Sequence, residues 1–269
     1  MKSRIAELLD LQYPPVAVHW ADGKPEGALQ FKQGKWGCVM FLLCNAAKGK
    51  PAAADRATFG CIGGGVGLGF GNMYTQFPGG IAEYLSTGNP EFCRTEFGKQ
   101  VAQAMPELEE GERYCKDPET AQNFIDGLPM VDVPEQYAVF RPLDMVEDGE
   151  RPATIVFLAN ADQISALVVL ANYGRRDRET VVAPFAAGCH QIGILPLAES
   201  KKQNPRAILG LTDISARKNT MGMIGHDFLT FAVPFKMFEV MEAHTAGSFL
   251  ERGQWDKVRE HAHKSRGGA

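Results

Sequence analysis

The sequence predicts an α/β fold of the mixed α+β kind, in which a mixed sheet is flanked by helices within a single domain over residues 1–269. Two observations support this prediction. Apolar runs rich in β-branched residues alternate along the chain with segments whose apolar residues recur at helical spacing. The chain is also long enough, with 269 residues of which 45% are hydrophobic, to bury a core without covalent cross-links.

Strands are predicted where apolar runs are bounded by Pro or Gly, at residues 16–20, 137–143, 154–158, 181–185, 207–211 and 228–233. Helices are predicted from apolar periodicity at residues 39–48, 80–85, 95–104, 118–125, 163–172, 235–246 and 254–263, with a further short amphipathic helix near the N-terminus. Asp117 before Pro118 is typical of a helix start, and Asp162 could cap the helix at 163 in the same way.

A weak internal similarity suggests two pseudo-repeated αβ halves, residues 1–104 and 137–263, joined by a surface connection. In each half a helix ends at Gly, passes through a polar turn and a β-like run, and reaches a Gly-Cys pair, at Cys61 and at Cys189. A true duplication would make these cysteines equivalent, and a pseudo-twofold axis could bring them together. Chance similarity of two αβ units explains the pattern equally well.

The composition argues against several classes of function. A net charge of −4 leaves no basic field to attract phosphate backbones, so we expect no nucleic-acid binding. No apolar run reaches the roughly 18 residues of a spanning helix, so we expect no membrane insertion. The N-terminal segment lacks the apolar stretch of a signal peptide, which predicts a cytoplasmic protein. In a reducing compartment we expect the 6 cysteines to be thiols, metal ligands or reactive groups, not disulfides.

The spacing of the cysteines matches no common metal motif, because no C-x₂-C pair occurs. Cys38 lies near the predicted start of a helix, where backbone N–H groups would stabilise a thiolate. Cys44 is turned away from Cys38 by roughly 600° of helical rotation. We expect it to pack as a small apolar side chain. Cys93 and Cys115 lie in charged surroundings and are expected to have no function.

Cys61 lies in the glycine-rich run TFGCIGGGVGLGFGN. Such a run carries little side-chain bulk, so a ligand or cluster could approach the backbone and accept hydrogen bonds from its N–H groups. We therefore expect Gly60, Gly63 and Gly64 to contact a cofactor. The run fits neither a dinucleotide-binding motif nor a P-loop. The alternative is a flexible loop around a buried cysteine.

Cys189 follows a predicted strand, which is where α/β folds place their sites and where a helix N-terminus would favour a thiolate. Its neighbour His190 could act as a metal ligand, as a base or only as a structural residue. Adjacent residues of a strand point to opposite faces, so a catalytic Cys189–His190 pair requires an intervening turn.

The segments WGCVMFLLCNAAKGK and FGCIGGGVGLGFG, with AAGCHQIG and AILGLTDISARK downstream, resemble the family called domain of unknown function 169. The resemblance covers most of the chain. Its most family-like elements are Cys38 ahead of a helix, the Gly-Cys-x-Gly-Gly turn at Cys61 and the Gly-Cys pair at Cys189, and the other cysteines match no family position. The family is common in archaea and anaerobes and has no settled activity. The resemblance therefore implies a fold and a set of cysteines, not a reaction.

The favoured hypothesis is an iron–sulfur protein in which Cys38, Cys61 and Cys189 ligate a cluster, with 4Fe–4S as the favoured type. Three cysteines leave one iron without a protein thiolate, and that iron could take Cys44, His190 or an exogenous ligand. An open iron would favour Lewis-acid catalysis or small-molecule sensing, whereas a fourth protein ligand would favour electron transfer with a redox partner.

Two alternatives stay open. One is a metal-free small-molecule binding module that uses the glycine-rich segment 60–71, and the other is a thiol enzyme with Cys189 as nucleophile and His190 nearby. The sequence does not decide whether the protein is an enzyme, and a homo-oligomer is one of the assemblies that it allows.

Overall fold

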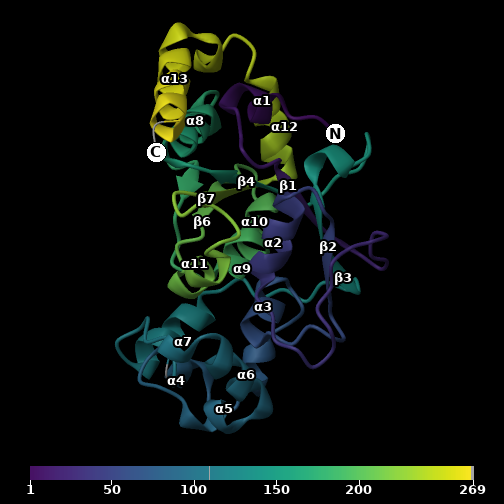
Figure 1. Ribbon diagram of the computed structural model, residues 1–269, viewed down its shortest axis with the longest axis vertical. Helices are drawn as coiled ribbons and strands as arrows, with labels where there is room; N and C mark the ends of the chain where they lie inside the picture. The colour runs from purple at the N-terminus through teal and green to yellow at the C-terminus, as the bar shows by residue number, and fades with distance from the viewer. Residues whose placement is uncertain (109, 268–269) are drawn as a thin grey trace.

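Seven strands form one mixed sheet at the centre of the computed structural model, which describes residues 1–108 and 110–267 (Figure 1). The strands are β1 (Val16–Ala21), β2 (Ala52–Asp55), β3 (Tyr137–Pro142), β4 (Thr154–Ala159), β5 (Val181–Val182), β6 (Ala207–Gly210) and β7 (Leu229–Pro234). Their order is β2-β3-β1-β4-β7-β6-β5, in which β5 and β6 are parallel and the other neighbours are antiparallel. The predicted mixed fold is confirmed.

The sheet interleaves strands from both ends of the chain, and the two pseudo-repeated halves are not confirmed. β1 lies between β3 and β4, so Val16 faces Pro142 on one side and Val156 on the other. A strand of the first predicted half is thus hydrogen-bonded between two strands of the second. Both ends of the chain therefore contribute to one common sheet.

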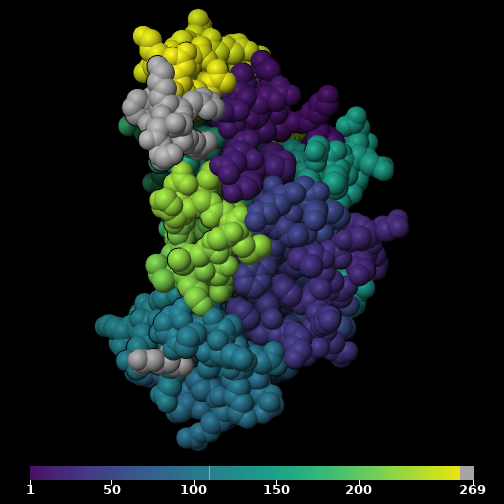
Figure 2. All heavy atoms as spheres, in the orientation of Figure 1, coloured from purple at the N-terminus to yellow at the C-terminus, as the bar shows by residue number. Residues whose placement is uncertain are grey.

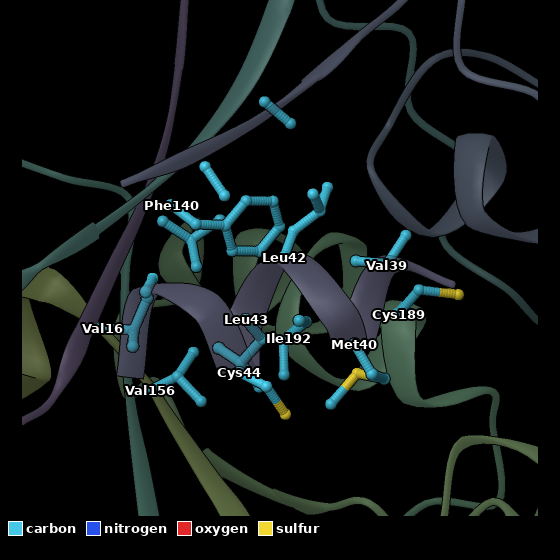
Figure 3. Close-up of a cluster of buried hydrophobic side chains, with 14 of the residues drawn as sticks. Val16, Val39, Met40, Leu42, Leu43, Cys44, Phe140, Val156, Cys189 and Ile192 are labelled. Atoms are coloured by element: carbon cyan, nitrogen blue, oxygen red, sulfur yellow. The ribbon is translucent and has the colours of Figure 1, made fainter. Parts of the chain in front are cut away.

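One face of the sheet is covered by α2 (Val39–Ala47), α9 (Gly188–Ile192) and α10 (Ile194–Ser200). Val16 and Val18 of β1 belong to this core, whereas Ala17 between them belongs to the core on the opposite face. The alternation follows from the two-residue period of a strand. Figure 3 shows the side chains of α2 packed close to Phe140 and Val156 of the sheet.

The opposite face is covered by α1 (Arg4–Leu9), α8 (Ala161–Asn172), α12 (Phe235–Ala243) and α13 (Gly253–Gly267). The indole nitrogen of Trp255 donates a hydrogen bond to the Leu8 carbonyl at 2.9 Å and so ties α13 to the N-terminal segment. Two 3₁₀ turns, Leu143–Met145 and Phe249–Glu251, connect elements on this side. Among the described residues, no helix has the length and apolar character needed to cross a membrane.

A helical lobe lies at the lower end of the molecule in Figures 1 and 2, packed directly against the sheet body. It is built from α3 (Ile62–Gly67), α4 (Ile81–Leu85), α5 (Pro90–Arg94), α6 (Glu96–Ala104), α7 (Pro118–Asp126) and the 3₁₀ turns Met73–Gln76 and Pro106–Leu108. The helix α11 (Ile214–Thr220) of the body borders it. Lys218 on α11 donates to the Ala104 carbonyl at 2.7 Å and pairs with Glu107 at 3.0 Å. The segment between residues 104 and 137, which was predicted to be a surface connection, therefore contributes the 3₁₀ turn Pro106–Leu108 and α7 to this lobe.

Most predicted elements are present, and the missed strand β2 has a clear reason. Its sequence Ala-Ala-Ala-Asp lacks the β-branched and aromatic residues that indicate a strand. It forms because its backbone pairs with β3, with Ala52 opposite Phe140 and Asp55 opposite Tyr137. Small side chains suit this position, since every residue of β2 is buried.

One predicted helix cap is confirmed and one is wrong. Asp117 caps α7 by accepting a hydrogen bond from the Thr120 N–H at 2.8 Å. Asp162 does not cap α8, because the helix begins earlier and Asn160 is its N-cap. The Asn160 and Gln163 side chains each accept a hydrogen bond from the other's backbone N–H at 3.0 Å, which satisfies both donors.

Replacing Asn160 by alanine is expected to lower the free energy of unfolding by about 1 kcal/mol, because the N-terminal N–H groups of α8 lose a partner. Asp162→Ala changes the same helix end but lies outside the capping box. It should change the free energy of unfolding by only about a few tenths of a kcal/mol. Urea unfolding of both variants checks this prediction. Equal losses would contradict the assignment of Asn160 as the cap.

Candidate functional site

A cavity of about 140 Å³ lies where the sheet body meets the helical lobe, and Cys38, Cys61 and Cys189 all line it. We call it the cysteine cavity. Each cysteine stands at the beginning of a helix: Cys38 and Cys61 are the N-cap residues of α2 and α3, and Cys189 is the second residue of α9. The fold thus brings to one cavity the three cysteines that the sequence indicated.

Two of the three sulfur atoms contact the first turn of α3. The Cys61 Sγ accepts a hydrogen bond from the Gly64 N–H at 3.2 Å, and the Cys189 thiol donates one to the Gly63 carbonyl at 3.4 Å. Burial raises the pKa of Cys38 to about 12 and that of Cys61 to about 11, and it raises the pKa of Cys189 well above the usual range. The nearby Cys61 further raises the pKa of Cys38, and Cys61 and Cys38 together further raise the pKa of Cys189. Without a bound cation, all three groups are therefore protonated thiols at neutral pH.

The arrangement does not fit a single metal ion. Within residues 1–108 and 110–267, no group of three or more His, Cys, Asp and Glu side chains is placed to hold one ion. An iron–sulfur cluster makes a different demand, because each thiolate binds its own iron atom and the sulfurs are spread around the cluster. Three thiols distributed over the wall of one cavity are compatible with that demand.

The middle of the glycine-rich run, Ile62–Gly67, forms the helix α3, so this part is not the flexible loop of the alternative prediction. A Cβ on Gly64 would lie 2.6 Å from the Phe59 ring, and one on Gly67 would lie 2.7 Å from the Cys189 Sγ and 2.8 Å from its carbonyl carbon. Gly64 is required because its Cβ would clash with the Phe59 and Val39 side chains, and Gly67 is required because α3 approaches the side chain and backbone of Cys189 in α9. Gly63 and Gly64 line the cysteine cavity, whereas Gly60 lies outside its lining and packs against the Lys35 carbonyl.

His190 is buried, with 1% of its surface exposed, and also lines the cysteine cavity. Its Nε2 lies 3.2 Å from the Tyr74 hydroxyl. Its Nδ1 is buried without a hydrogen-bond partner among the described residues. Burial lowers the pKa of His190 to about 4, so the imidazole is neutral at physiological pH. A neutral ring with one nitrogen engaged and the other unpartnered is the usual state of a histidine ligand.

The other cysteines do not line the cavity. Cys44 is completely buried in the core under the sheet, and Figure 3 shows it well along α2 from Val39 and Cys189. It is therefore not a candidate for a fourth ligand. Cys93 and Cys115 are half-buried in the helical lobe, outside the cavity lining.

A polar network that sequence reasoning missed forms a second part of the cavity wall. Ser215 donates to the Glu112 carboxylate, and its Oγ lies 2.8 Å from the Tyr114 hydroxyl. Asp213 accepts from the Ser215 N–H at 2.9 Å and, through its other oxygen, from the Gly188 N–H at 3.1 Å. Since Gly188 precedes Cys189, the carboxyl groups border the thiols. No local motif marks Glu112, because only the lobe's contact with α11 gives it a role.

The two carboxyl groups are held in an unfavourable environment for charge. Burial, and next to it the charge of Asp213, raises the pKa of Glu112 to about 7. Burial also raises the pKa of Asp213, against the effect of its backbone hydrogen bonds. Among the described residues that line the cavity, none is Lys or Arg.

Cys189 is expected to resist alkylation at neutral pH in the metal-free protein, because its thiol is buried and its pKa is raised. Treatment with iodoacetamide followed by peptide mass spectrometry should label Cys93 and Cys115, which are half-buried, well before Cys189. Selective labelling of Cys189 would instead support a thiol enzyme. His190 is not placed to act as that enzyme's base, since its Nε2 lies against the Tyr74 hydroxyl and it follows Cys189 on the same helical turn.

Comparison with known proteins supplies a family but no function. A search of curated proteins finds no match, and neither does a search of solved structures. The profile of the family domain of unknown function 169, described as Uncharacterised ArCR, matches residues 4–244. Because this match covers nearly the whole chain, including all three cavity cysteines, the chain belongs to the domain of unknown function 169 family.

Proposed function

We propose that the protein is an iron–sulfur protein, with the cluster bound in the cysteine cavity by Cys38, Cys61 and Cys189. The observation that carries the proposal is the convergence of these thiols, from three distant parts of the chain, on one buried cavity. In this cavity, water does not stabilise the thiolate form of the cysteines, which is why their pKa is raised. Bound iron would displace the thiol protons, and the resulting thiolates would be stabilised by the metal. The Gly64 N–H that already bonds Cys61 would also stabilise a bound thiolate.

We further propose His190 as the fourth protein ligand, in preference to Cys44. His190 lines the cavity and its Nδ1 is unpartnered among the described residues, while Cys44 is in the core. The tautomer in which Nε2–H donates to Tyr74 leaves the Nδ1 lone pair for iron. Four protein ligands favour electron transfer over Lewis-acid chemistry, so the bound cluster would supply a one-electron redox centre.

The test is preparation of the protein without oxygen, followed by iron and sulfide analysis and optical spectroscopy. We expect about four irons and four sulfides per chain and the broad visible absorbance of a cluster. Absence of iron and sulfide from such preparations, and after reconstitution with both, would end the proposal.

The His190 assignment has its own test. Since imidazole ligation raises the potential of a cluster relative to thiolate ligation, His190→Cys should retain the iron and lower the reduction potential. Protein film voltammetry of both forms measures the shift. An unchanged potential would exclude His190 as a ligand while leaving the three cysteines in place.

A metal-free binding function is the second candidate, favoured by the mostly aromatic and aliphatic lining of the cavity beyond the thiols. It differs from the first in one measurable respect. A metal-free module keeps its ligand affinity after the protein has been treated with an iron chelator.

A further inference from the structure

The part of the cysteine cavity bounded by Glu112, Tyr114, Asp213 and Ser215 has a chemistry that the cluster does not use. We call it the carboxyl end. No ion pair involves Glu112 or Asp213 among the described residues, and no Lys or Arg lines the cavity. Asp213 is buried and Glu112 is half-buried, and their hydrogen bonds come from neutral groups, so no cation neutralises either carboxylate.

Aromatic rings stand next to these carboxyl groups. The Tyr114 and Phe185 rings pack edge to face with centroids 6.1 Å apart, and the Phe124 ring lies 5.0 Å from Phe185. All three rings line the cavity, and the Tyr114 hydroxyl bonds to Ser215. Phe185 is 51% exposed, so this wall extends from the cavity to the surface.

We propose that the carboxyl end binds a small organic cation, a protonated amine with apolar substituents, which enters past Phe185. The ammonium group would donate hydrogen bonds to Glu112 and Asp213, and its alkyl groups would lie against the aromatic rings. Hydrogen bonds between charged partners are the strongest available, and aromatic faces attract ammonium groups. The inference rests on the proposed function only in assigning the thiol part of the cavity to a cluster.

Other ligand classes fit less well. An anion would meet two carboxyl groups and no cationic side chain. A neutral apolar molecule would leave both carboxyl groups without a cationic partner, and burial already holds the pKa of each above its usual value. A strongly hydrated inorganic cation would gain little from Tyr114, Phe124 and Phe185. An organic cation is the class that satisfies the carboxylates and the rings together.

The experiment compares tert-butylammonium with tert-butanol, two probes of nearly the same shape of which one is a cation. Both are titrated into the full-length, iron-containing protein at pH 8 by isothermal titration calorimetry. We expect the cation to bind at least about tenfold more tightly than the alcohol, since only it makes charge-assisted hydrogen bonds. Equal binding of both probes, or binding of neither, overturns the proposal.

Variants then locate the binding site. Asp213→Asn and Glu112→Gln should each weaken tert-butylammonium binding by about tenfold or more while retaining hydrogen-bonding capacity. The matched control is Asp117→Asn. Asp117 and Asp213 are both helix N-caps, asparagine is an equally good cap, and Asp117 lies outside the cavity. Unchanged binding in Asp213→Asn and Glu112→Gln, with both folded by circular dichroism, overturns the proposal.

Repeating the titration on chelator-treated protein separates the two proposals. If the protein binds the cation but never holds iron, the carboxyl end is supported as a cation site and the cluster proposal is wrong. If the protein holds iron and sulfide but binds the two probes equally or not at all, the cluster proposal stands and the cation-site proposal is wrong.

Discussion

Simultaneous replacement of Cys38, Cys61 and Cys189 by serine is expected to abolish iron binding. Serine has nearly the same volume as cysteine but is a poor ligand for iron in a cluster, so the cavity would persist without its soft donors. The anaerobically purified variant should contain essentially no iron or sulfide and should show no visible absorbance. Because metal binding is coupled to folding, its thermal midpoint should fall to that of the chelator-treated wild type.

The control is the double variant Cys93→Ser, Cys115→Ser. It changes the remaining half-buried cysteines of the lobe, which lie outside the cavity. It should keep the iron content, the spectrum and the thermal midpoint of the wild type. Full iron content in the triple variant, or equal loss in the control, would mean that the cavity cysteines do not ligate the metal.

The second large effect is expected from Gly67→Ala. The added methyl group would lie within 2.8 Å of the Cβ and the carbonyl carbon of Cys189, so α3 and α9 would have to separate. Such overpacking typically costs about 1–3 kcal/mol, which should exceed the gain of roughly 1 kcal/mol in helix propensity. Chemical denaturation should therefore show a loss of stability. Since Cys189 is displaced, the iron content should fall as well.

Gly63→Ala is the matched control on the same helix. A Cβ at position 63 meets only the Tyr74 ring and hydroxyl, at 3.5 Å or more, which is ordinary van der Waals contact. Its stability in the metal-free state should equal or slightly exceed that of the wild type. If Gly67→Ala were as stable as Gly63→Ala, the close approach of α3 to α9 would not constrain the site.

Much of the layered fold is readable from local patterns. The strand residues Val16, Ala17 and Val18 alternate between two cores because a strand has a period of two, and the β-branched Val16 and Val18 already indicate the strand. The same holds for Asp117, whose short acidic side chain before a proline predicts a helix cap. Where competing local signals exist, the prediction fails. Asn160, not Asp162, caps α8 because only Asn160 has Gln163 at the position that completes the capping box.

The glycine-rich run shows why local reading misleads at the site. Glycine freedom favours a loop when only the sequence is considered. In the folded protein, Gly64, Gly65 and Gly67 lie in α3, where neighbouring side chains and the backbone of α9 leave no room for a Cβ. Tertiary packing therefore overrides a weak local preference.

By itself, the sequence determined most of the elements, the place of Cys38 at the start of a helix, and the packing of Cys44 in a core, because these properties depend on residues within a few positions of each other. Only the tertiary structure decided that Cys38, Cys61 and Cys189 share a cavity, that His190 joins them, and that Glu112 meets Asp213 there. Such meetings depend on how α2, α3, α9 and α11 pack against each other, and contacts between segments far apart in the chain leave no periodicity or spacing in a single sequence.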